Sequence, residues 1–393
     1  MTPAARVQAA IELLDQIIVG ARQGGAPADR IVADGFRARR YAGSKDRRAI
    51  RELVYAAIRA CGPVPSSGRA AMLRLAQIEA SIAGLFDGSV YGPPAIGPDE
   101  QAAAGGIAPE WLEQALAAAG IAGEEAAALL ARAPLDVRVN TLKAARDTLE
   151  LPAAAEPLPA PNGLRFLHGT QAEQWDAYRD GRIEVQDCGS QLACVAAAAR
   201  PGETVIDLCA GAGGKTLALA AAMQNTGLLI ASDTDRARLS RLEPRAERAG
   251  AAIAGTVLLD PGKELEALWE WRAKADLVLV DAPCSGTGTW RRNPEARWRL
   301  SEKRLGQVLR TQGHLLEIAA ELVKPGGRIA YVVCSLLDCE GAERIERFLQ
   351  AHPGWRAAPP ALPLGRAHGP GWRLTPFHDG TDGFFIAQLS GPC

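Results

Sequence analysis

The feature that most constrains the fold is a regular alternation of short apolar runs with helical segments, which begins near residue 183. The runs are continuous rather than alternating, as in strands that are buried on both faces of a parallel sheet. They lie at 204–208, 228–232, 277–280 and 328–333. Helical segments between parallel strands are typical of βαβ units. The sequence therefore predicts an α/β chain with a Rossmann-like, doubly wound domain over residues 176–393.

The N-terminal part has a different periodicity. Residues 1–88 carry apolar side chains at helical spacing, for example Ile50, Val54 and Ile58, and no strand-like run. This predicts an all-α domain. A Gly- and Pro-rich stretch after it predicts a linker. Residues 109–175 begin with a helical piece and then alternate like a strand at 137–142, which predicts a small α/β subdomain that links the other two.

The glycine-rich turn after the first strand of the large domain is the strongest local signal. Glycines in such a turn let the backbone approach a ligand at the carboxyl end of the strand. A phosphate-binding P-loop would need glycine where Cys209 stands, so that motif fails. A dinucleotide fingerprint would use Gly211 and Gly213 but needs a third glycine at Thr216. Neither nucleotide motif is complete.

S-adenosylmethionine remains as the third interpretation, since its binding turn needs small residues but no pyrophosphate cradle. Asp233 ends the next strand, where a carboxylate would meet a ribose diol, although a helix cap is the alternative for this residue. Asp260 follows a further strand-like run and would meet the adenine. The predicted cofactor-binding residues are Cys209, Ala210, Gly211, Ala212, Gly213, Gly214, Lys215, Asp233, Asp260 and Asp281.

Two cysteines follow strands that should share one edge of the sheet. Cys284 follows the run at 277–280, and Cys334 follows the run at 328–333. Ligand sites of open parallel sheets lie at the carboxyl ends of their strands, so we expect both thiols near the cofactor. Each cysteine alone is more often a packed thiol than a catalyst. Together, beside a methyl-donor site, they indicate a specific reaction.

That reaction is methylation of carbon 5 of cytosine, which is a poor nucleophile until a thiolate adds to carbon 6. Loss of the carbon-5 proton then expels the thiolate. Asp281 would hydrogen-bond the cytosine amino group and N3, and Lys215 would orient Asp281 or supply positive charge. The base must leave any stack to reach such a pocket.

Net charge is −1, which does not by itself indicate a nucleic-acid binder. Two segments are nevertheless basic. Residues 37–51 hold seven Lys and Arg side chains against Asp46 alone, and residues 291–310 are similar. Either segment could follow a phosphate backbone, and a solvated helix face is the alternative. The eight cysteines lack zinc-ligand spacing, so no metal is expected. No export signal or membrane span is recognised, which predicts a cytoplasmic protein, and nothing demands more than a monomer.

Beyond the two cysteine motifs, several segments resemble the RsmB/Sun family of RNA 5-methylcytosine methyltransferases. The matching pieces are 186–191, 207–215, 281–285, 291–294, Trp298, 331–335 and 382–387. Residues 137–143 are similar to the strand that opens the family's small RNA-contacting subdomain. Residues 44–59 are similar to the NusB-like RNA-binding helical domain that some members carry.

The resemblance implies that S-adenosylmethionine is the cofactor and that Cys334 is the nucleophile attacking carbon 6. It implies that Cys284 assists release of the methylated base. It also implies an RNA partner, small-subunit (16S) ribosomal RNA in the NusB-like members. The chain departs from the family pattern at Ala212, where Pro is usual, and at 338–342, where only Glu340 matches.

Four alternatives stay open at this point. The same chemistry could act on transfer RNA. The chain could be a non-catalytic RNA-binding factor of ribosome assembly. The thiols could exchange roles, with Cys284 as nucleophile, as in DNA cytosine methyltransferases. The chain could methylate an exocyclic nitrogen, but such enzymes carry an Asp/Asn-Pro-Pro-aromatic motif where this chain has 281–284, and Cys284 stands in place of the aromatic residue.

Overall fold

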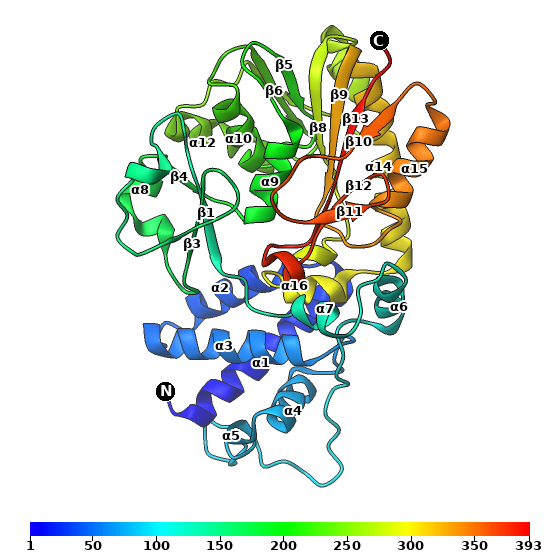
Figure 1. The fold of residues 1–393 in the computed structure, drawn as a ribbon. Helices are drawn as coiled ribbons and strands as arrows, with labels where there is room; N and C mark the ends of the chain where they lie inside the picture. Colours follow the sequence, from blue (N-terminus) through cyan, green and yellow to red (C-terminus); the bar gives the residue numbers. More distant parts are fainter. The chain divides into compact units, whose positions relative to one another are not determined.

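The computed structural model describes residues 1–393 and divides into two compact units (Figure 1). One unit comprises residues 1–131 together with 289–301, and the other comprises residues 132–288 and 302–393. The first is helical and the second is mixed α/β, so the predicted α/β fold with an all-α N-terminal part is confirmed. No helix is both long and apolar enough to cross a bilayer.

The helical unit is built around its first helix. Its elements are α1 (Pro3–Gln23), α2 (Ala28–Ala38), α3 (Ser44–Ala60), α4 (Gly68–Ile78), α5 (Ala80–Ala83), α6 (Glu110–Ala118), α7 (Gly123–Ala128) and the 3₁₀ turn η5 (Pro294–Arg299). The side chain of Thr2 caps α1 by accepting from the backbone N–H of Ala5 at 3.2 Å. Leu14 and Ile17 on α1 are fully buried in one core with Ile50 and Ile58 of α3, which matches the helical spacing in the sequence.

The segment 289–301 belongs to this helical unit although it lies far along the chain. Arg297 is fully buried and donates to the carbonyls of Ile58 and Cys61 at 2.6 and 2.7 Å. Trp298 packs into the core cluster of α1 and α3, and its indole N–H donates to the carbonyl of Gly62 at 3.1 Å. The last carbonyls of a helix have no partner within the helix, and here Arg297 satisfies them at the end of α3.

This arrangement corrects one sequence expectation. The sequence indicates that the basic run at 291–310 could form a surface that follows a phosphate backbone. In the structure, however, Arg291 and Arg297 are only 6% and 0% exposed. Burial lowers the pKa of Arg297 to about 9. These two arginines are inside the helical unit and do not present their charge to solvent. A charge run in the sequence gives no sign of such burial.

A small antiparallel sheet opens the second unit. Its strands are β1 (Leu135–Val139), β2 (Glu156–Pro157), β3 (Gly163–Phe166) and β4 (Ile183–Val185), in the order β2-β3-β1-β4. Asp136 is buried and forms an ion pair with Arg165 at 2.7 Å, and it accepts from the backbone N–H of Cys188 at 3.1 Å. Cys188 begins α9 (Cys188–Ala197). The carboxylate therefore fixes the small sheet to the helix that follows it.

The large sheet has nine strands. They are β5 (Thr204–Asp207), β6 (Leu228–Asp233), β7 (Gly255–Leu258), β8 (Ala275–Asp281), β9 (Val323–Val333), β10 (Arg356–Ala358), β11 (Arg366–His368), β12 (Gly371–Leu374) and β13 (Phe384–Ser390). Strands β7-β6-β5-β8-β9 are parallel in that order, and β13 pairs antiparallel with β9. The strands predicted from the apolar runs are confirmed.

Helices cover both faces of this sheet, as Figure 1 shows. They are α9, α10 (Gly214–Ala222), α14 (Glu302–Leu322) and α15 (Ala342–Ala351), with the shorter α8 (Asp176–Arg179), α11 (Arg236–Leu239), α12 (Leu242–Ala249), α13 (Glu264–Ala267) and α16 (Pro376–Asp379). Alternate strand residues face opposite layers. Leu277 and Leu279 pack with α9 and α10, whereas Val278 and Val280 pack with α14 and α15.

The strand order creates one reversal. From β5 the chain proceeds outward to β6 and β7, and it then returns to place β8 on the other side of β5. Ligands of doubly wound sheets bind at the carboxyl ends of the strands, next to such a reversal. The loops that follow β5 and β8 are therefore the part of the fold in which a site is expected.

Candidate active site at the carboxyl edge of the sheet

The turn between β5 and α10 depends on glycine. Gly211 and Gly213 have φ angles of 56° and 89°, in the left-handed region that L side chains rarely adopt. A Cβ on Gly213 would lie 2.2 Å from Cδ1 of Leu242, so the turn packs against α12. A Cβ on Gly214 would contact nothing within 4 Å. The first residue of α10 therefore has open space beside it.

Asp233 braces this turn from the end of β6. It is 8% exposed, and its Oδ2 accepts from the backbone N–H of Gly211 at 2.7 Å. Its Oδ1 accepts from the backbone N–H of Asp235 at 2.7 Å. The helix cap that the sequence left open is supplied by Asp235, which accepts from the N–H of Arg238 at the start of α11. Asp260 is exposed two residues beyond β7.

These groups fit S-adenosylmethionine better than a nucleotide phosphate. The N-terminus of α10, with its unpaired N–H groups, suits the carboxylate of the amino acid moiety. Asp233 and Asp260 supply acceptors for hydroxyl or amino groups. A P-loop would need Lys215 to face the phosphates, but its Nζ is 2.6 Å from Oδ2 of Asp281. The lysine is therefore committed to a different partner.

Asp207, the last residue of β5, is a group to which the sequence analysis assigned no role. It is fully buried, and its Oδ2 accepts from the hydroxyl of Thr216 at 2.7 Å. Its Oδ1 has no hydrogen-bond partner. Burial raises the pKa of Asp207 to about 7. The sequence feature that could have identified this group is an aspartate between an apolar strand and a glycine turn.

Asp207 should make the folding stability depend on pH. The unfolded chain releases this proton near pH 4, whereas the native state holds it to about pH 7. Between these values the native state binds one proton more, so this group's contribution to stability falls as pH rises from about 4 to 7. Asp207→Asn should flatten that slope in urea unfolding measured from pH 4.5 to 7.5. The exposed Asp260→Asn variant should keep the parent's slope, and equal slopes in all three proteins would contradict the prediction.

Lys215 and Asp281 form an ion pair across the reversal in strand order. Lys215 lies in the first turn of α10, the helix that follows β5, and Asp281 is the last residue of β8. Their side chains are 11% and 31% exposed. Burial by itself would lower the pKa of Lys215, but the charge of Asp281, its hydrogen bond and nearby sulfurs together outweigh burial, and the pKa is raised. The lysine therefore stays charged, and it holds one oxygen of Asp281 in place.

The two predicted cysteines lie together beyond the neighbouring strands β8 and β9. These strands are parallel and in register, with Asp281 opposite Val332. The Sγ atoms of Cys284 and Cys334 are 3.4 Å apart, and both side chains are partly exposed. The hydrogen bond to Cys334, together with burial, raises the pKa of Cys284. Cys284 is therefore held as a neutral thiol against its neighbour's sulfur.

The other cysteines behave differently. Burial raises the pKa of Cys61, Cys188 and Cys194 to about 11 each. Cys209 lies in the glycine turn, and burial raises the pKa of its thiol also. These thiols are packed and protonated, which agrees with the sequence expectation for most of the eight.

Sequence reasoning missed the polar groups behind the two thiols. Ser285 and Ser335 each follow a cysteine, and both hydroxyls bond to the buried carboxylate of Glu340. Gln312 of α14 donates to the same carboxylate at 2.9 Å. The only signal for Glu340 was its agreement with the family pattern, and Gln312 had none.

Comparisons with known proteins identify relatives of this chain. A family model described as 16S rRNA methyltransferase RsmB/F matches residues 194–390. A probable ribosomal RNA small subunit methyltransferase B from Synechocystis sp. is 36% identical over 270 residues, covering 65% of this chain and 59% of that protein. The corresponding protein of Bacillus subtilis is 32% identical over 303 residues, covering 72% and 66%.

Among solved structures, the crystal structure of PH0851 is similar over 99% of both chains, with a TM-score of 0.75 and 26% sequence identity. The likeness to this structure therefore extends over both units. The alignment with the Synechocystis relative spans 59% of that relative's length, which is less than two thirds of it.

Proposed function

The chain belongs to the RsmB/F family of 16S rRNA methyltransferases, and from this we propose that it methylates carbon 5 of a cytosine in small-subunit ribosomal RNA. The observation that carries the proposal is the pair of sulfur atoms 3.4 Å apart, beyond the end of β8 where Asp281 and Lys215 meet. A single buried thiol would serve packing alone. Two partly exposed thiols at a strand edge, next to a charged pair, suit covalent chemistry on a ring.

S-adenosylmethionine is the methyl donor of this family, and it would supply an electrophilic methyl group to the carbon that Cys334 activates. The residues that would hold it are the turn from Cys209 to Lys215, with Asp233, Asp260 and Asp281 near the ends of the neighbouring strands. The open space at Gly214 and the braced carboxylate of Asp233 support this assignment.

Cys334 acts as the nucleophile in the proposed reaction. Its thiolate forms a bond to carbon 6, and the ring electrons shift so that carbon 5 becomes nucleophilic. After carbon 5 has gained its methyl group, loss of the carbon-5 proton returns the electrons to the ring and breaks the bond to sulfur. Cys284, in contact with the attacking sulfur, assists this release.

Asp281 is the group proposed to recognise the base. One oxygen accepts from Lys215, and its side chain remains 31% exposed, so the other oxygen can accept from a cytosine amino group. A base that presents a hydrogen-bond donor to this carboxylate is favoured over uracil, which presents a carbonyl there. The charged Lys215 keeps Asp281 oriented.

A direct test is methyl transfer followed by bisulfite sequencing. The protein, S-adenosylmethionine and either free 16S ribosomal RNA or small subunits should give one protected cytosine. Total transfer RNA, treated in parallel, tests the substrate alternative. Calorimetry with S-adenosylmethionine tests the assembly-factor alternative, since a non-catalytic factor need not bind the donor. Absence of any protected cytosine in all the RNAs, despite donor binding, would reject the proposal.

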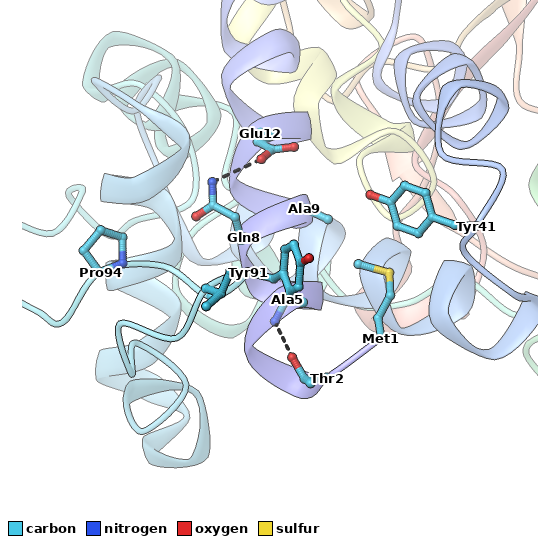
Figure 2. Close-up of a pocket in the computed structure, with 11 residues that line it drawn as sticks. Met1, Thr2, Ala5, Gln8, Ala9, Glu12, Tyr41, Tyr91 and Pro94 are labelled. Atoms are coloured by element: carbon cyan, nitrogen blue, oxygen red, sulfur yellow. Dashed lines mark hydrogen bonds between the residues drawn. The ribbon is translucent and has the colours of Figure 1, made fainter.

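The helical unit offers a surface for the RNA partner. A cavity of about 880 Å³ is lined by α1 and by two loops, and Figure 2 shows Gln8 and Glu12 of α1 with Tyr41 and Tyr91. The two tyrosines are 71% and 76% exposed. The basic run 37–51 surrounds Tyr41 in the sequence. Exposed rings on which bases can stack are typical of single-stranded nucleic-acid binding, so we assign this cavity to an unpaired stretch of the substrate.

Removal of either ring should weaken RNA binding. Tyr41→Ala and Tyr91→Ala should each raise the Kd for single-stranded RNA about tenfold, because stacking on one ring contributes about 1–3 kcal/mol. Fluorescence anisotropy at fixed salt measures this. Val90→Ala removes another exposed side chain from the same cavity and should leave the Kd unchanged. Equal Kd values for all four proteins would exclude the cavity as an RNA contact.

A further inference from the structure

Glu340 is a fully buried carboxylate behind the two thiols. Its Oε1 accepts from the backbone N–H of Ser285 at 2.8 Å and from the side-chain amide of Gln312 at 2.9 Å. Its Oε2 bonds to the hydroxyls of Ser285 and Ser335. Both oxygens therefore face donors, which is the pattern of an ionised carboxylate rather than of a carboxylic acid.

The partners of Glu340 are the residues next to the two sulfurs. Ser285 directly follows Cys284, and Ser335 directly follows Cys334. Further bonds join the same two loops: the two serine hydroxyls are 3.1 Å apart, and the backbone N–H of Gly288 donates to the carbonyl of Cys334 at 3.0 Å. The carboxylate is the one group that bonds directly to both serines.

Gln312 connects this network to the scaffold. It is fully buried on α14, and its amide also donates to the carbonyl of Pro283 at 2.9 Å. Pro283 precedes Cys284 in the chain. The Cys284 loop is therefore held from both sides of the cysteine by one carboxylate, in the turn between β9 and α15, and one amide on α14.

Burial of a carboxylate costs several kcal/mol unless donors surround it, and apolar residues of similar volume often serve stability as well or better. Stability alone therefore gives little reason for this network. Its geometry has a specific consequence, because the position of one sulfur relative to the other depends on it. Reaction rates are sensitive to displacements of about 1 Å in such groups.

We propose that Glu340 is the positioning residue of the site: through Ser285 and Ser335 it fixes the contact between the Cys284 thiol and the Cys334 sulfur, and its charge acts on the Cys284 thiol. The inference rests on the proposed function for its catalytic meaning. Its geometric and electrostatic parts concern the thiols alone.

Charges on the surrounding elements distinguish the environments of the two sulfurs. The hydrogen bond to Cys334 is the largest cause of the raised pKa of Cys284, followed by burial, and the charge of Glu340 acts in the same direction. Tyr331 of β9 donates to the backbone carbonyl of Glu340 at 2.8 Å and is itself protonated, since burial raises its pKa. The cation near Cys334 is Lys215, whose pKa that sulfur helps to raise. Cys284 thus faces the anion and Cys334 the cation.

The test uses Glu340→Gln in a Cys334→Ser background and follows alkylation of Cys284 by iodoacetamide across pH, with mass spectrometry of its peptide. Without the anion, the midpoint of the alkylation profile should shift to lower pH. Glu343→Gln, which removes an exposed charge three residues away on α15, should leave the midpoint unchanged. An unchanged midpoint in Glu340→Gln would overturn the electrostatic part.

The second measurement is steady-state methylation by Glu340→Gln with both cysteines present. The rate constant kcat should fall about 100-fold while KM for RNA stays within about twofold, because the thiols move and the RNA surface does not. Equal losses in kcat for Glu340→Gln and Glu343→Gln would reject the positioning role. If Glu340→Gln does not fold, Ser335→Ala replaces it in this measurement, because it removes one of the hydroxyls that bond to Glu340. Ser335→Ala should lower kcat about tenfold. The alkylation profile needs no methylation, so it still tests Glu340 if the proposed function fails.

Discussion

The Cys334→Ala protein should transfer methyl groups to RNA at least about 1,000-fold more slowly than the parent, because carbon 5 of cytosine is not nucleophilic until a thiolate adds to carbon 6. Cys284 is not a ready substitute, since burial raises its pKa even where the hydrogen bond to Cys334 is absent. Transfer of a labelled methyl group under single-turnover conditions gives the rate. Binding of S-adenosylmethionine, measured separately, should be unchanged.

The companion variant distinguishes the two thiols. Cys284→Ser should still form the bond between Cys334 and the base but should release it slowly, so RNA should stay covalently attached on a denaturing gel. RNA that carries 5-fluorocytosine traps the same adduct in the parent. If the Cys284→Ser protein forms no adduct while Cys334→Ala does, the nucleophile is Cys284 and the roles are reversed.

The second large effect concerns stability. Arg297→Met should destabilise the helical unit by about 3 kcal/mol or more, because it leaves the buried carbonyls of Cys61 and Pro294 without their donor and removes one of the two donors to that of Ile58. Methionine keeps much of the side-chain length but supplies no N–H group. Hydrogen exchange of the α3 amides, followed by mass spectrometry, should lose about 100-fold of its protection.

A matched variant controls for the loss of positive charge. Arg48 is exposed on the same helix α3 and forms no ion pair, so Arg48→Ala should change stability by less than about 0.5 kcal/mol. If the α3 amides are protected from hydrogen exchange equally in the Arg297→Met and Arg48→Ala proteins, Arg297 does not hold the end of this helix.

The sequence predicts best what repeats along the chain. The strands β5, β6, β8 and β9 are short apolar runs, and each was placed to within a few residues. The position of Cys284 and Cys334 at one edge of the sheet also follows from the sequence, because parallel strands bring their carboxyl ends to one edge. Only the type and order of elements are needed for that inference.

Side-chain contacts between distant segments could not be predicted in the same way. Arg297 and Arg291 stand in a basic run that has the composition of a solvated surface, yet both are buried. Gln312 lies on an amphipathic helix with nothing to separate it from its polar neighbours in the sequence. The short strands β2 and β10 have two and three residues, too few for a periodic signal.

The return of residues 289–301 to the helical unit has a consequence for synthesis of the chain. Translation adds about 5–20 residues per second, so on the order of ten seconds or more separate the emergence of α3 from that of Arg297 and Trp298. During that interval the nascent N-terminal helices lack the indole that completes their interior and the guanidinium that closes α3. They remain open to chaperones and proteases until most of the polypeptide has left the ribosome.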